Sequence, residues 1–119
     1  MKKTFTASEI TQTALRILEL NGFKAWRANN LAVKGRKFIG RKGVADITGY
    51  EKHTGKRLEC EVKAGKDTLS DDQHEFLSDV AVNGGYALIA TQKDNKIVIQ
   101  YYYEMSGGTD GIQNKVINQ

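Results

Sequence analysis

The segment that decides the fold is Arg57-Leu58-Glu59-Cys60-Glu61-Val62-Lys63, in which charged and uncharged residues alternate. Alternate side chains of a β-strand point to the same face, so this pattern predicts one charged face and one core-facing face. Asp46 precedes the segment by a hairpin-sized gap, and a paired strand would bring it beside Glu61 and Lys63. Two carboxylates at one point make a hard oxygen site suited to Mg²⁺. A neighbouring lysine can orient water or stabilise developing negative charge, which suits phosphodiester cleavage.

The charged face also has a simpler interpretation, because exposed strands with alternating charges are common. Two features of the surrounding sequence argue against that interpretation. Val44, Ile47 and the predicted helices need a sheet that is buried on at least one side. The charged row is also flanked by Asp46, a glycine-rich basic loop and a helix start, and charges in a cleft are costly unless they pair or bind a metal.

The composition indicates one compact globular domain. The 119 residues are 39% hydrophobic and 27% charged, and no apolar run approaches the length of a membrane span. We expect a single domain at residues 1–105 and a polar C-terminal tail at 106–119. Cys60 is the only cysteine, so an internal disulfide is impossible and a cytoplasmic location is expected. Neither a membrane partner nor a nucleotide cofactor is expected.

Basic residues gather in one glycine-containing segment. The net charge of +4 and the pI of about 9.2 modestly favour a polyanionic partner. Residues 34–43 combine glycines with Lys34, Arg36, Lys37, Arg41 and Lys42. Glycine lets a backbone approach phosphate closely, so this segment is predicted to grip phosphates, and a solvated basic loop is the alternative.

Capping signals and hydrophobic spacing place two helices and several strands. Thr6-Ala7-Ser8-Glu9 and Ser70-Asp71-Asp72-Gln73 have the form of capping boxes, which predict helices over about 7–20 and from 70 to the stop at 83–85. Strands are predicted at 23–29, 44–50, 57–63, 86–90 and 96–103, with a short one around 37–39. This order predicts an α/β layer, with a mixed central sheet and a helix on each side.

The motifs occur in a familiar order: residues 43–47 (Gly-Val-Ala-Asp-Ile), Glu61-Val62-Lys63 and then Gln73 in the next helix. Residues 26–30, 38–43 and 70–77 add an arginine–asparagine element, a glycine-punctuated lead into the aspartate and a capped helix. Together they resemble the virus-type replication-repair nuclease (VRR-NUC) domain, a branch of the PD-(D/E)xK nuclease superfamily, over roughly residues 9–90. The resemblance implies a restriction-endonuclease-like fold and a standalone protein of the phage or bacterial type.

The resemblance also implies a site for Mg²⁺, or Mn²⁺ in its place. Asp46 and Glu61 would be metal ligands, and the Val62 carbonyl would add a third oxygen. Glu9 matches the additional acidic residue of the family, a direct or water-mediated ligand. Because Glu9 is also the third residue of a predicted helix, it is equally suited to capping, and the two roles can coexist.

Lys63 and Gln73 complete the catalytic set that the resemblance implies. Lys63 would position the attacking water or stabilise the pentavalent phosphate. Gln73 would orient Lys63 or touch the scissile strand, and its alternative role is again a helix cap. Glu59 has no role in the family and is expected at the surface or behind the ligands. The implied activity is that of a metal-dependent endodeoxyribonuclease that leaves a 5′-phosphate.

The predicted DNA contacts come from the segment between the first strand and Asp46. They are Arg27, Asn29, Asn30, Lys34, Arg36, Lys37, Arg41 and Lys42. Most would meet phosphate, which gives affinity without sequence reading. Trp26 is a stacking candidate, but its alternating neighbours favour a place in the core.

Small standalone members of the family resemble Holliday junction resolvases. We therefore expect a homodimer that cuts branched DNA. Flaps or general duplex DNA are alternative substrates, and a non-catalytic DNA-binding accessory protein on the same scaffold is an alternative function. The complete set of Asp46, Glu61 and Lys63 argues against the non-catalytic alternative.

Overall fold

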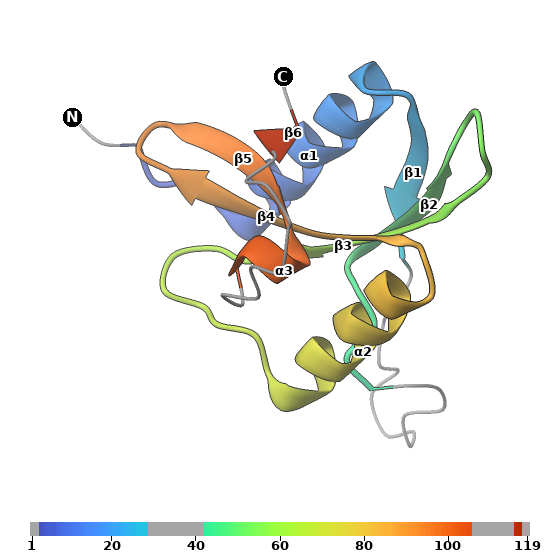
Figure 1. Cartoon of the computed structure of the whole chain (residues 1–119). Helices are drawn as coiled ribbons and strands as arrows, with labels where there is room; N and C mark the ends of the chain where they lie inside the picture. Colours follow the sequence, from blue (N-terminus) through green and yellow to red (C-terminus); the bar gives the residue numbers. More distant parts are fainter. Residues whose placement is uncertain (1–2, 29–41, 106–115, 118–119) are drawn as a thin grey trace, which may run out of the picture.

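The computed structural model describes residues 3–28, 42–105 and 116–117 (Figure 1). The described chain forms one sheet of six strands in the order β1-β2-β3-β4-β5-β6. The elements along the chain are α1 (Ala7–Leu20), β1 (Phe23–Arg27), β2 (Ile47–Glu51), β3 (Arg57–Val62), α2 (Asp71–Val82), β4 (Tyr86–Lys93), β5 (Lys96–Tyr101), α3 (Tyr102–Met105) and β6 (Val116–Ile117). None of the described helices is long and apolar enough to cross a membrane.

The sheet is mixed, as the sequence predicts. All neighbouring strands pair antiparallel except β3 and β4, which are parallel. Parallel strands need a crossover connection, and α2 provides it between β3 and β4. The predicted α/β class with a mixed central sheet is therefore confirmed.

Helix α1 covers one face of the sheet (Figure 1). Its capping box is present, because the Thr6 side chain accepts from the Glu9 N–H while the Glu9 side chain accepts from the Thr6 N–H. The buried stripe of α1 packs with the uncharged side of β3, in a cluster that includes Ile10, Ala14, Ile17, Leu18, Leu58, Cys60 and Val62. The core-facing half of the predicted alternation in β3 is therefore confirmed.

Helix α2 covers part of the opposite face (Figure 1). It begins with the predicted capping box between Ser70 and Gln73. Its apolar side packs with β4 and with residues next to the sheet, in a cluster of Ala45, Phe76, Leu77, Val80, Ala87, Ile89 and Tyr102. The charged side of β3 thus faces a second apolar layer, and Glu59 and Glu61 are only 3% and 2% exposed.

Several predicted boundaries were wrong. The second strand begins at Ile47 instead of residue 44, β1 ends at Arg27, and β4 continues to Lys93. The last predicted strand ends at Tyr101, where a short helix begins with the buried Tyr102. Residues 116–117, which belong to the predicted C-terminal tail, form β6 and pair with Ile99 and Gln100 of β5. The short strand predicted around 37–39 lies outside the described residues.

Gly43 fixes the path of the chain into Asp46. Its φ is +79°, and a Cβ atom added to it would lie 2.4 Å from the carbonyl carbon and oxygen of Asp72. The backbone of residue 43 therefore touches the first turn of α2, and only glycine allows that approach. Gly55, in the β2–β3 turn, has a similar φ of +74° but open space around the same added atom.

We expect Gly43→Ala to destabilise the protein more than Gly55→Ala. Gly55→Ala adds only left-handed backbone strain, worth about 1–2 kcal/mol. Gly43→Ala adds the same strain and a clash with α2, which should cost roughly 1–3 kcal/mol more. Urea unfolding of the two variants measures the difference, and equal losses of stability would contradict the contact.

Candidate active site

The β2–β3 register brings Asp46 and Glu61 together. Ile47 pairs with Cys60, so the antiparallel register continued by one residue places Asp46 opposite Glu61. The Val62 N–H donates to Asp46 Oδ2 at 2.8 Å, which fixes the aspartate against the end of β3. The two carboxyl groups predicted to form a metal site are thus neighbours on the face that α2 partly covers.

Burial and the neighbouring Asp46 strongly raise the pKa of Glu61. Loss of solvent, followed by a hydrogen bond with Asp46 and the Asp46 charge, raises the pKa of Glu61 to about 9, and Lys63 offsets this only in part. Glu61 Oε2 is buried and has no hydrogen-bond partner. The protonated form of Glu61 is therefore favoured beside Asp46 unless a cation neutralises the charge there.

The donor set fits a divalent cation. A buried carboxylate oxygen without a partner, next to a second carboxylate, is unfavourable unless a positive charge stabilises it. Across the described ranges no cluster of three or more His, Cys, Asp and Glu side chains is placed to hold a metal. Two protein carboxylates still suit Mg²⁺, which commonly takes its other ligands from water and substrate phosphate.

Lys63 follows β3 directly and lies beside a cavity. Its backbone N–H donates to the Ala90 carbonyl at 3.0 Å, which extends the parallel pairing of β3 with β4. Its side chain helps to line a hollow of about 240 Å³ whose walls also include Leu69, His74 and Thr91. His74 Nδ1 lies 3.0 Å from the Tyr102 hydroxyl. No local sequence pattern predicts this cavity, because its walls come from several separate elements.

Glu9 and Gln73 both serve as helix caps. Glu9 Oε1 accepts from the Thr6 N–H at 3.0 Å, and this hydrogen bond is the main cause of the lowered pKa of Glu9. Gln73 Oε1 accepts from the Ser70 N–H at 2.9 Å. The capping interpretation of both residues is confirmed, while their additional roles in metal binding or catalysis stay predictions.

Glu59 is buried and paired one step behind Glu61 on the same face. Its Oε2 accepts from Thr48 Oγ1 at 2.6 Å and from Arg57 Nε at 3.0 Å. Arg57 also lies over the Phe76 ring, with 5.4 Å between Cζ and the ring centroid. Glu59 therefore links β3 to β2 through the Thr48 hydroxyl and, through Arg57, to the Phe76 ring of α2, which is a supporting role behind the site.

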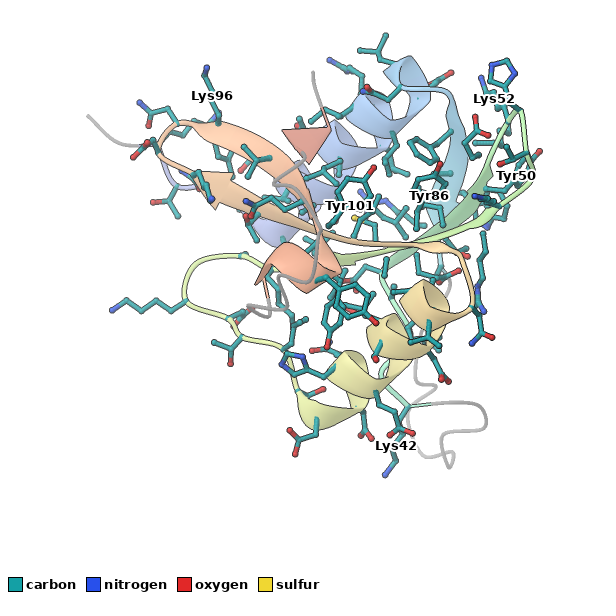
Figure 2. All side chains as sticks on the ribbon, in the orientation of Figure 1. Lys42, Tyr50, Lys52, Tyr86, Lys96 and Tyr101 are labelled. Atoms are coloured by element: carbon teal, nitrogen blue, oxygen red, sulfur yellow. The ribbon has the colours of Figure 1, made fainter. Side chains whose placement is uncertain are left out.

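Two of the predicted DNA contacts lie in the described structure. Arg27 and Lys42 are exposed, and Lys42 points away from the domain below α2 (Figure 2). The other six lie outside the described residues: Asn29, Asn30, Lys34, Arg36, Lys37 and Arg41.

The expected core position of Trp26 was wrong, because its side chain is 48% exposed. Phe23 and Ala25 of β1 face the α1 layer, so Trp26 points to the other face. The apolar cluster under α2 contains no residue of β1 or β2, so within the described part of the chain no apolar layer covers Trp26.

Comparison with known proteins identifies the fold. No protein-family model matches the chain, and no curated protein matches it. The structure is similar to that of Hjc, a Holliday junction resolvase from the archaeal hyperthermophile Archaeoglobus fulgidus, with a TM-score of 0.53 and 23% sequence identity. The match covers 78% of this chain and 70% of Hjc. The chain therefore has the restriction-endonuclease-like fold that the sequence predicted.

We expect Glu61 to make the metal-free protein less stable as the pH rises. The folded pKa of about 9 lies above the ordinary glutamate value of about 4.5, so the folded state binds the extra proton between these values. Stability is greatest below the unfolded pKa and falls as the pH rises toward 9, by up to about 1.4 kcal/mol per pH unit. The isosteric variant Glu61→Gln should lack this component.

Urea unfolding of wild type and Glu61→Gln from pH 5 to 9 measures that component as a difference between the two curves. Excess Mg²⁺ should flatten the wild-type curve, because the cation takes the place of the proton on Glu61. Parallel curves for the two proteins would show that Glu61 titrates normally.

Proposed function

We propose that this protein is a Mg²⁺-dependent endodeoxyribonuclease that cuts branched DNA, such as Holliday junctions. The observation that carries the proposal is the Asp46–Glu61 pair, with its buried and unpartnered Glu61 oxygen and with Lys63 on the same strand face. The likeness in fold to Hjc, a Holliday junction resolvase, supports the choice of a branched substrate. The order of the motifs further supports a VRR-NUC-like protein of the phage or bacterial type.

Asp46 and Glu61 would hold the ion, Mg²⁺ or Mn²⁺, with the Val62 carbonyl and Glu9 as further candidate ligands. When bound, such an ion supplies Lewis-acid chemistry for phosphodiester hydrolysis. With the ion bound, Glu61 would be held in its ionised form, because a nearby cation would offset the burial and the Asp46 charge that otherwise favour the protonated form.

Lys63 places an ammonium group two residues beyond Glu61 on the same face of β3. There it stabilises negative charge that develops on the phosphate, or it orients the water that attacks the phosphorus atom. The P–O3′ bond breaks, which leaves a 3′-hydroxyl on one fragment and a 5′-phosphate on the other. Gln73, in the first turn of α2, would steady Lys63 or the scissile strand.

Basic residues at the end of the sheet near Asp46 would bind the DNA backbone. Arg27 and Lys42 are exposed, and the net charge of the chain is +4. Phosphate contacts of this kind hold DNA without reading its sequence, so the shape of the branch becomes the feature that is recognised. A homodimer would place two such sites on one junction, and the cytoplasm is the proposed compartment.

Replacement of Lys63 tests the proposal directly. Lys63→Ala should slow Mg²⁺-dependent cleavage of a synthetic four-way junction by about 10²-fold or more, the usual scale for one electrostatic donor in an active site. Lys96→Ala is the matched control, because Lys96 is an exposed lysine at the β4–β5 turn. Lys96 also lies well away from Lys42, a predicted DNA contact (Figure 2). The control should cleave within a few-fold of wild type.

Flap and linear duplex substrates, each assayed with and without EDTA, extend the same experiment. Preference for the junction supports the branched-DNA function, whereas equal cutting of all three substrates indicates a general nuclease. Lack of cleavage by the wild-type protein in Mg²⁺ or Mn²⁺ would leave a DNA-binding accessory protein on a nuclease scaffold.

A further inference from the structure

Trp26 and Tyr50 form an exposed aromatic pair on the sheet. Their rings meet edge to face, with 6.3 Å between centroids and an interplanar angle of 72°. Trp26 is 48% and Tyr50 42% exposed. The other large apolar side chains that are comparably exposed in the described structure, Leu20 and Val82, occupy the last positions of α1 and α2. The Trp26–Tyr50 pair instead lies within two strands, where a large aromatic side chain is usually covered.

The pair shares its face with the candidate active site. Trp26 pairs with Thr48 and Thr48 with Glu59, so these three form the row next to the Asp46–Glu61 row. A strand rises about 3.3 Å per residue, so Trp26 lies roughly 7 Å from the acidic row along the strands. Trp26 also lies one strand, or about 4.8 Å, to the side of Asp46, so the total separation of roughly 8 Å corresponds to about two or three stacked nucleotides.

Cations flank the aromatic pair. Lys24 and Arg57 both pair with Tyr50 in the sheet, one on each side of it. The Arg57 side chain is 59% exposed and its Nε is held by Glu59 at 3.0 Å. Lys52 is also exposed close to Tyr50, at the outer end of β2 (Figure 2). Open aromatic faces surrounded by positive charge suit the bases and phosphates of single-stranded nucleic acid better than an apolar protein surface.

We propose that Trp26 and Tyr50 form a stacking platform for unpaired DNA bases next to the scissile phosphate. The proposal rests on the nuclease function proposed above and adds how a branch is distinguished from a duplex. Bases inside a duplex already stack on one another, whereas a branch point offers open base faces. Stacking accepts every base, so the platform selects structure and not sequence.

Trp26 is the only tryptophan of the chain, so its fluorescence reports on the platform alone. We expect metal-free Lys63→Ala protein to show saturable quenching of tryptophan emission with oligo-dT and with an open four-way junction. A blunt duplex of equal length should quench much less. Because this assay needs no cleavage, it tests the platform independently of catalysis.

Variants then measure the contribution of each ring. Tyr50→Leu and Trp26→Leu should weaken binding of fluorescently labelled oligo-dT by roughly 5- to 150-fold, the range for loss of one stacked base. Trp26→Phe should retain part of the affinity, because it keeps an aromatic ring. Val82→Ala is the control, since Val82 is 72% exposed at the end of α2, and its affinity should stay within twofold of wild type.

Unquenched emission with oligo-dT, or leucine variants that bind as tightly as Val82→Ala, would overturn the platform. A spectral shift that depends on protein concentration without DNA would also overturn it, by showing that a second copy covers the pair. Junction cleavage by wild type, measured in parallel, separates the two proposals. Cleavage without quenching removes only the platform, and quenching without cleavage removes only the nuclease.

Discussion

The site depends on one register, that of β2 against β3. This register sets Asp46 opposite Glu61 and lets the Val62 N–H bind the aspartate. A slip of one residue would turn every side chain of β3 to the other face and would bury its charges under α1. The register also forces two carboxyl groups into one buried place, where the protonated form of Glu61 is favoured. The same contact therefore opposes stability at high pH and creates the demand for a cation.

Packing on both faces holds that register. The uncharged side chains of β3 pack against α1. On the other face, α2 packs on β4, and its Phe76 lies under Arg57 at the first residue of β3. The parallel β3–β4 pairing continues beyond β3 through the Lys63 N–H, so this candidate catalytic lysine is held by the sheet. Gly43 adds a backbone contact with the first turn of α2, which connects the segment before Asp46 to the helix that carries Gln73. The candidate catalytic residues are thus held by rigid elements whose positions depend on one another.

Much of this arrangement could be predicted from local sequence. The two capping boxes predicted the helix starts, and the alternation from Arg57 to Lys63 predicted which side of β3 meets the apolar core. The exposure of Trp26 could not be predicted, because it depends on how much of a face one helix covers, which is a property of the whole fold. The pairing of β6 with β5 and the cavity beside Lys63 join segments far apart in sequence, so no local pattern records them.

The two faces of the sheet differ, because α1 packs on one face through a continuous apolar cluster, whereas α2 covers only part of the other. The α1 side is closed by a continuous apolar cluster, so under the proposed function a DNA substrate would approach the acidic row from the α2 side. On that side the β1–β2 half carries Trp26 and Tyr50 between cations, and the β3–β4 half carries Lys63 and its cavity. A strand of DNA that crosses from one half to the other would carry a phosphate over Asp46 and Glu61. Such a path suits a flexible, unpaired strand at a branch better than a stiff duplex, because its bases can turn away from the backbone toward the aromatic side chains.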